Sequence, residues 1–334
     1  MKRRQLIQAG AAIALPPSIW AQAQVQVQAQ AQTLGAWPDK PIKMILSQPP
    51  GSGPDNVARL LGERLAKALG QAIVIDNKPG GQNVIGAQAA ARSAADGYSF
   101  YFATTAALVT NSYLFKTMPY NPQKDFAPVA FIAKSPFAVL VKAESGVASI
   151  QDLMAKSKAT PGTFSLGNEG PRTFGGIIAR LINARTAMQA NLVPYASVGV
   201  ALQDLIGGNV DAVVADVAST AQLVRQGRLR MLAVTNGKRI AGWEQVPALA
   251  EVLPGFEMIG WFGVVAPVGT PQAVVLKLNQ EINKLLAERD VAERILTIGP
   301  IVEAGGSTDQ FAGFLRDEHQ RWGQVAKEIG LLPE

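Results

Sequence analysis

The sequence contains no cysteine and only one histidine, His319. Without cysteine the chain can form neither disulfide bonds nor a thiolate nucleophile. With one histidine it cannot build a His/Cys metal site or a Cys–His pair, and no G-x-S-x-G motif accompanies His319 to suggest a serine hydrolase. His319 lies within "RDEHQRW", and we expect it at the surface, solvated or partly packed. We therefore expect neither a metal nor a cofactor.

Three further features are missing. No internal apolar stretch approaches the ~20 residues that a membrane-spanning helix needs. Basic residues are scattered and not interleaved with aromatic ones, so no nucleic-acid partner is expected. No glycine-rich turn ends in the GK[ST] of a nucleotide-hydrolysing loop or matches G-x-G-x-x-G. These absences favour binding over catalysis. Catalysis by carboxylates alone stays open, with candidates that spacing cannot pair: Asp55, Glu169, Asp211 and Asp216.

The N-terminal segment has the pattern of an export signal. Residues 1–23, "MKRRQLIQAGAAIALPPSIWAQA", combine a basic start, a short apolar middle and small residues before a cleavage point at Ala23. The adjacent Arg3 and Arg4 leave both the general and the twin-arginine export routes open. Residues 24–36 are uncharged and of low complexity, which predicts a disordered tether.

The rest of the chain is long enough for two lobes, since 48% of the 334 residues are hydrophobic. Strand and helix patterns alternate from residue 42, which predicts an α/β fold with parallel sheets covered on both faces. Two long extended runs, residues 126–143 and 255–269, flank a complete inner α/β unit. We therefore predict a clamshell whose lobes are joined by two crossing strands, with residues 37–137 plus 256–334 in lobe 1 and 138–255 in lobe 2. Its ligand would lie in the cleft.

One turn in lobe 1 has the composition of an anion site. In "LSQPPGSGPDNVARLL", residues 46–61, a glycine-rich turn joins an apolar strand to a helical pattern. Backbone amides and the helix dipole favour anions at such a position. Gly51 and Gly53 permit a close approach, and Ser52 offers a hydroxyl donor. We expect Asp55 to be the helix N-cap, because a second carboxylate would repel a bound one. The alternative is an ordinary glycine-rich turn.

Five segments resemble a known family in order and spacing. They are "PPGSGPDNVARLL", "DNKPGGQNVIGAQAAARSAADGYSF", "YNPQKDFAPVAFIA", "VPYASVGVALQDLIGGNVDAVV" and "GWFGVVAPVGTP". Together they resemble the Bug (Bordetella uptake gene) proteins, the periplasmic solute receptors of tripartite tricarboxylate transporters. The resemblance extends from Trp37 through essentially the whole mature chain. It implies a type II periplasmic-binding (Venus flytrap) fold without catalytic activity. It also implies a periplasmic monomer that binds a small organic carboxylate and passes it to membrane permease subunits.

In this family, backbone donors and bridging waters hold a carboxyl group in the first lobe. The resemblance therefore places the ligand-binding residues at matching positions in both lobes of this chain. In lobe 1 they are Gln48, Pro50, Gly51, Ser52, Gly53, Thr104 and Thr105. In lobe 2 they are Asn168, Gly170, Arg172, Thr173, Ser197 and Asp216.

The chain departs from the family pattern at pocket positions. Gln48 replaces a common aromatic residue, and Glu169 and Thr173 stand where glycine and histidine are typical. Ala106, Ala107 and Ala196 also lack polar groups that the family often has there. These losses favour a less polar acid with one main carboxylate.

Two residues keep alternative interpretations. Arg172 either clamps a second carboxylate, or pairs with Glu169 or points to solvent at a helix start. Asp216 either accepts a hydrogen bond from a ligand amine or hydroxyl, or is a cap or turn residue. The identity of the carboxylate stays open. So do two other functions: a carboxylate-only enzyme of the same architecture, and a receptor that feeds a membrane sensor.

Overall fold

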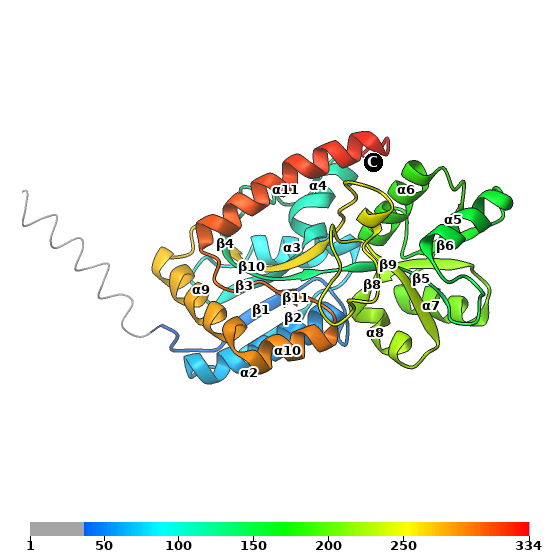
Figure 1. The fold of residues 1–334 in the computed structure, drawn as a ribbon. Helices are drawn as coiled ribbons and strands as arrows, with labels where there is room; N and C mark the ends of the chain where they lie inside the picture. Colours follow the sequence, from blue (N-terminus) through cyan, green and yellow to red (C-terminus); the bar gives the residue numbers. More distant parts are fainter. Residues whose placement is uncertain (1–36, 334) are drawn as a thin grey trace, which may run out of the picture. The chain divides into compact units, whose positions relative to one another are not determined.

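The computed structural model describes residues 37–333 (Figure 1). The predicted export signal and tether, residues 1–36, lie outside the described residues. From Lys40 onward the chain forms one compact unit that contains two mixed sheets, one in each lobe of a clamshell. None of the described helices combines the length and apolar character that crossing a bilayer requires.

Sheet A, in the first lobe, is six-stranded with the order β11-β4-β10-β3-β1-β2. Its strands are β1 (Ile42–Leu46), β2 (Ile73–Asn77), β3 (Ser99–Thr104), β4 (Phe126–Ser135), β10 (Gly260–Pro267) and β11 (Ile301–Val302). The helical segments of this lobe are α2 (Gly53–Leu69), η1 (Gly81–Asn83), α3 (Val84–Ala91), η2 (Ala106–Thr110), α4 (Asn111–Leu114), α9 (Gln272–Ala287), α10 (Arg289–Ile298) and α11 (Thr308–Glu328).

Sheet B, in the second lobe, is five-stranded with the order β7-β6-β8-β5-β9. Its strands are β5 (Phe137–Lys142), β6 (Ser165–Asn168), β7 (Asn191–Pro194), β8 (Ala212–Asp216) and β9 (Leu229–Val234). Its helices are α5 (Ile150–Ala159), α6 (Phe174–Thr186), α7 (Val198–Gly207) and α8 (Val217–Arg225), and a short turn, η3 (Leu249–Glu251), follows β9.

The sheets are mixed: the predicted parallel βαβ pairings are present, and antiparallel strands are added to them. β1 runs parallel to β2 and β3, and β6 runs parallel to β7 and β8. The strands that enter from the other lobe are antiparallel: β10 to β3 and β4, and β5 to β8 and β9. A strand that arrives from the opposite lobe runs against the βαβ direction of its new sheet, which strand propensity does not reveal.

The first predicted extended run crosses between the sheets as two strands, β4 in sheet A and β5 in sheet B, with Pro136 between them. The second run is strand only from Gly260, as β10; the return from β9 passes through residues 235–259. Close to both crossings, the amide of Met258 donates to the carbonyl of Thr235 at 2.8 Å, and the Thr235 amide donates to Phe137 at 2.9 Å. The two connections therefore lie side by side.

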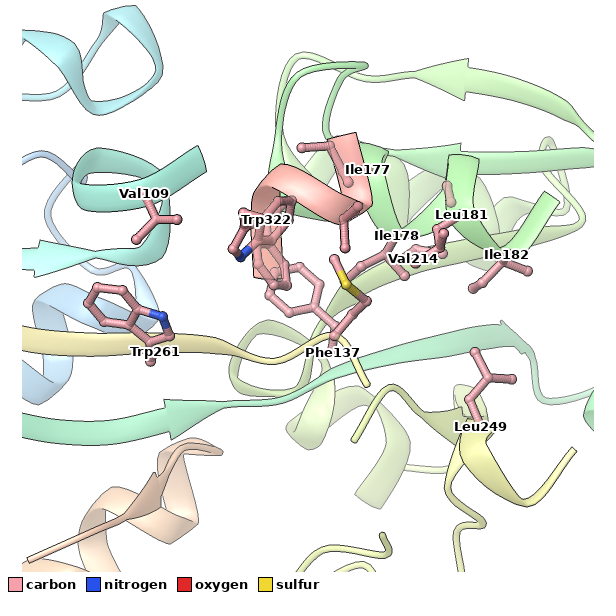
Figure 2. Packing of buried hydrophobic residues seen from close by; sticks show 14 of the residues in the cluster. Val109, Phe137, Ile177, Ile178, Leu181, Ile182, Val214, Leu249, Trp261 and Trp322 are labelled. Carbon is pink, nitrogen blue, oxygen red and sulfur yellow. The ribbon is translucent and has the colours of Figure 1, made fainter. Parts of the chain in front are cut away.

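A continuous apolar core joins the two lobes on one side (Figure 2). The ring of Phe174 in α6 lies 4.9 Å from Phe137 and 5.4 Å from Trp322 of α11. The end of α11 is also held by polar contacts, because Arg185 of α6 donates to both carboxylate oxygens of Glu328 at 2.7 and 2.8 Å. The C-terminal helix of the first lobe is thus attached to the second.

Two helical glycines make a matched test of packing near the predicted site. A Cβ on Gly86 would lie 2.4 Å from Ser47 Oγ and 2.9 Å from Ser47 Cα, whereas a Cβ on Gly62 would meet nothing closer than 3.4 Å. We predict that Gly86→Ala lowers the free energy of unfolding by about 1–3 kcal/mol through overpacking. Gly62→Ala should raise it by about 0.5–1 kcal/mol, because alanine favours the helix. Urea denaturation measures both; changes of equal sign and size would contradict this packing.

Candidate functional site

The glycine-rich turn leads directly into α2, but the N-cap lies three residues earlier than expected. Gly53 is its first residue and Ser52 its N-cap, so the prediction that Asp55 is the N-cap was wrong. Pro54 accounts for the shift, since proline suits the first helical turn, where it removes an amide that has no partner in any case. The Ser52 hydroxyl donates to the carbonyl of Pro49 at 2.8 Å and does not cap the helix. The first amides of α2 therefore lack a side-chain cap.

Asp55 fixes the conformation of this turn from within. Its carboxylate, only 1% exposed, accepts hydrogen bonds from the Gly51 amide at 2.8 Å, Arg59 Nε at 2.8 Å and Asn77 Nδ2 at 2.9 Å. Burial disfavours its charge, but these hydrogen bonds outweigh burial and hold the pKa of Asp55 below its usual range. The Gly51 amide is consequently engaged, and the positive φ of Gly51, 82°, is the conformation that glycine adopts without strain.

Two buried side-chain oxygens at the carboxyl ends of β1 and β3 in sheet A have no hydrogen-bond partner among the described residues: Gln48 Oε1 and Thr104 Oγ1. Leu46 of β1 pairs with Phe102 of β3, so Gln48 and Thr104 each follow this pair by two residues on neighbouring strands. Buried polar atoms are normally hydrogen-bonded, and leaving one unpaired is costly. This edge of the sheet therefore has the capacity to bind a polar group or a water.

The turn at residues 81–83, which sequence reasoning did not single out, holds the Gln48 side chain in place. The Gln48 amide donates to Asn83 Oδ1 at 2.6 Å, and the Ser47 hydroxyl donates to the carbonyl of Asn83 at 2.9 Å. Gly81, Gln82 and Asn83 all have positive φ, at 55°, 52° and 76°. Such a run is strained for residues with side chains, and strain of this kind concentrates at functional sites. The available signal was the Gly-Gly pair followed shortly by asparagine, which tolerates this conformation.

Thr105 lies beside Thr104 but faces a different partner. Its hydroxyl accepts a hydrogen bond from the Trp261 amide at 2.8 Å, and its side chain is 3% exposed. Trp261 Nε1 in turn donates to Glu318 Oε2 of α11 at 2.8 Å. The Thr105 hydroxyl thus fixes β10 next to β3, and its contact with ligand stays a prediction, as it does for the exposed Pro50.

In lobe 2 the predicted residues gather where β6 and β8 end. These strands are parallel neighbours, so Asn168 and Asp216, their last residues, lie at the same edge of sheet B. The buried Asn168 side chain accepts from the Gly170 amide at 3.0 Å. Thr173 caps α6 by accepting from the Gly176 amide at 3.1 Å, and it donates to the carbonyl of Gly170 at 2.8 Å. These groups build the turn between β6 and α6.

Two carboxyl groups approach each other at this edge. Asp216 is the N-cap of α8 and accepts from the Ser219 amide at 2.8 Å and hydroxyl at 2.7 Å. Glu169 accepts from the Gly175 amide of α6 at 3.5 Å. Burial raises the pKa of Glu169 to about 7, and the negative charge of Asp216 contributes to this shift. Burial raises the pKa of Asp216 as well.

The start of α2 in lobe 1 touches the start of α8 in lobe 2. A Cβ on Gly53 would lie 2.9 Å from Ala218 Cβ and 3.9 Å from Asp216 Oδ1. A Cβ on Gly299 would also lie 2.7 Å from the Ala218 backbone. Gly53 therefore permits a close approach between lobes, and it brings the glycine-rich turn next to Asp216 and Glu169.

Arg172 and Ser197 are less closely tied to this group. Arg172 is half-buried in the turn before α6. Its role, whether as a carboxylate clamp or as a partner of Glu169, stays a prediction. Ser197 is exposed and caps α7, because its hydroxyl accepts from the Val200 amide at 3.4 Å. Its role in binding is likewise a prediction.

The described residues contain no group of three or more His, Cys, Asp and Glu side chains that could hold a metal ion. His319 is 9% exposed and lines a surface groove with Tyr113 and Lys116. Burial lowers the pKa of His319, so the residue is neutral at pH 7 and packed rather than solvated.

Comparison with known proteins identifies the family. The model of the tripartite tricarboxylate transporter family receptor matches residues 57–331. The chain belongs to this receptor family. It is 34% identical over 298 residues to protein BugT of Bordetella pertussis, covering 88% of this chain and 90% of that protein. The resemblance to the Bug proteins is thereby confirmed.

Solved structures confirm the clamshell fold of this receptor. Rpa4515 of Rhodopseudomonas palustris, solved with adipate, is 32% identical with a TM-score of 0.82, over 89% of this chain and 100% of that one. MatC of Rhodopseudomonas palustris, solved with bound malate, is 27% identical with a TM-score of 0.77, over 86% and 99%. Members of the family are periplasmic solute-binding receptors.

The raised pKa of Glu169 predicts how stability depends on pH. Between about pH 4.5 and 7 the unfolded chain has an ionised Glu169 while the folded one retains the proton, so this group's contribution to stability falls as pH rises through that window. We predict that Glu169→Gln raises the melting temperature more at pH 8 than at pH 5. Thermal unfolding across this range measures the effect, with Glu144→Gln, at an exposed position, as control. A pH-independent difference would contradict the assigned pKa.

Proposed function

We propose that this receptor is exported to the periplasm, captures a small organic carboxylate in the cleft between its lobes, and delivers it as a monomer to membrane permease subunits. Membership of the tripartite tricarboxylate transporter receptor family supports the binding role. Solved relatives carry adipate and malate, so carboxylates are bound within this fold. We further propose that the lobes divide at residues 137/138 and 255/256, close to the paired connections beside Thr235 and Phe137.

The observation that carries this proposal is the pair of buried, unpartnered oxygens on Gln48 and Thr104, close in sequence to the uncapped start of α2 and to the end of β3. A ligand carboxylate would accept hydrogen bonds from the Thr104 hydroxyl and from the first amides of α2, where the helix dipole favours negative charge. Gln48 Oε1 is an acceptor and needs a donor, which a bridging water supplies. If nothing polar bound there, the two unpaired oxygens would destabilise the folded protein without any evident reason.

Binding to purified protein tests this function directly. A panel of mono- and dicarboxylates should stabilise the folded protein, by about 2.7 kcal/mol at a ligand concentration of 100 times Kd. For a chain of this size that is a rise of several degrees in melting temperature. The corresponding alcohols and amides, without a carboxylate, are the control. Absence of any carboxylate-specific shift would contradict the receptor function.

The same samples separate the receptor from an enzyme. Chromatography of the ligand after long incubation should recover it unchanged and in stoichiometric amount. Conversion to product would favour the carboxylate-only enzyme, for which Glu169 and Asp216 are now a spatially paired candidate. A receptor that feeds a membrane sensor shares the binding step, and only uptake of labelled ligand by cells with and without the permease distinguishes the two.

The contact of Gly53 with Ala218 predicts a second effect on binding. Gly53→Ala places a methyl group 2.9 Å from Ala218 Cβ, which pushes the lobes apart where a ligand would be enclosed. We predict that it weakens carboxylate binding by about tenfold, equal to about 1.4 kcal/mol, while the unliganded melting temperature changes little. Isothermal titration measures both proteins, and Gly199→Ala, whose Cβ meets nothing closer than 3.9 Å, is the control. Unchanged affinity for Gly53→Ala would exclude this closed contact from the bound state.

A further inference from the structure

The second lobe presents two acidic groups, which would face the far end of a ligand whose carboxylate is bound in the first lobe. Glu169 follows β6 and Asp216 ends β8, and the two strands are parallel neighbours, so both carboxyl groups lie at one edge of sheet B. They are close enough for the charge of Asp216 to disfavour ionisation of Glu169. Glu169 accepts from the Gly175 amide and Asp216 from the Ser219 amide and hydroxyl. Both groups therefore present carboxyl oxygens, which are hydrogen-bond acceptors when ionised, at this end of the sheet.

These groups lie next to the proposed carboxylate site. Asp216 Oδ1 is 3.9 Å from the position of a Cβ on Gly53, the first residue of α2. The orphaned oxygens of Gln48 and Thr104 mark the polar edge of sheet A that this turn continues. In the proposed cleft, the start of α2 would therefore offer donors to an anion, while Glu169 and Asp216 would offer acceptors.

This arrangement has a direct consequence for ligand chemistry. A second ligand carboxylate that reached Glu169 and Asp216 would place a third acid among like charges, which disfavours the ionised form of all three. An ammonium or hydroxyl group would instead donate to the two carboxylates and offset the cost of their burial. Asp216 retains its hydrogen bonds from Ser219 in either case.

We propose that Glu169 and Asp216 determine ligand specificity, so that the receptor takes a carboxylate whose far end carries an amine or a hydroxyl and discriminates against a dicarboxylate of the same length. This inference rests on the proposed function, because it assigns the other end of the same cleft. It separates this chain from its solved relatives, whose adipate and malate both carry two carboxylates.

Isothermal titration with length-matched ligands tests the inference: 6-aminohexanoate and 6-hydroxyhexanoate against adipate, and 4-aminobutyrate and 4-hydroxybutyrate against succinate. At pH 8, within each set of equal length, the wild type should bind either the amine or the hydroxyl ligand at least about tenfold more tightly than the dicarboxylate. Glu169→Gln keeps the shape and removes the charge, and should reduce this preference by about tenfold. Asp216→Asn, which retains an N-cap side chain, should reduce it as well. Exposed Glu144→Gln should leave it unchanged.

The pH dependence of wild-type binding gives a second test that needs no variant. From pH 6 to 8 Glu169 ionises, so affinity for the ω-amino acids should rise while affinity for the dicarboxylates falls. Other charged groups nearby are Asp216 on β8, Arg172 before α6, and Asp55 with its partner Arg59 on α2. The Asp55 carboxyl, whose pKa is lowered, is ionised throughout this range, and arginine stays protonated.

The outcomes distinguish this inference from the proposed function. Tighter binding of dicarboxylates by the wild type at pH 8, or a preference that Glu169→Gln leaves unchanged, overturns the specificity assignment while the receptor function stands. Failure of every carboxylate to bind overturns both.

Discussion

The site depends on how three helix starts obtain hydrogen-bond acceptors. α2, α6 and α8 each follow the end of a strand and present unpaired amides at their first turns. A carboxyl group of the chain accepts a backbone hydrogen bond at each of the three: Asp55 from the turn before α2, Glu169 from α6, and Asp216 from α8. Only at α2 does the N-cap side chain leave the helix amides uncapped. That difference makes one helix start available to an external anion and leaves the other two internally satisfied.

The lobes meet differently on the two sides of the molecule. Near α11 they are joined by the aromatic contacts of Phe174 and by the two hydrogen bonds from Arg185 to Glu328. At the glycine-rich turn they meet through small residues, with Gly53 against Ala218. Large interdigitated side chains resist separation, whereas contacts between small residues bury little area and separate at low cost. The contacts between the lobes are therefore more extensive near α11 than at the glycine-rich turn.

Local sequence patterns predicted the elements better than their relations in space. The strand of residues 42–46, the glycine-rich turn and the following helix were all correct, and only the helix start differed, because Pro54 favours an earlier first turn. The antiparallel entry of β5 and β10 depends on which lobe a strand comes from, and the pairing of Glu169 with Asp216 depends on β6 lying beside β8. Neither relation has a local signal. The turn at Asn83 did have a local signal, the Gly-Gly pair before it, but the hydrogen bond between Gln48 and Asn83 that makes it important has none.

In the proposed binding mode, Glu169 is the residue that favours one ligand carboxylate rather than two. The resemblance to the Bug proteins places a glycine at this position, which would leave the first amides of α6 open to a second anion from the ligand. Here the Glu169 carboxyl accepts from the Gly175 amide and fills that position with an acid that becomes negatively charged above about pH 7. Two helix starts that could each bind a carboxylate are thereby made unequal: α2 still favours an anion, and α6 together with Asp216 favours a donor. In this proposal, glutamate at position 169 sets the polarity of the second lobe's half of the site without a change of fold.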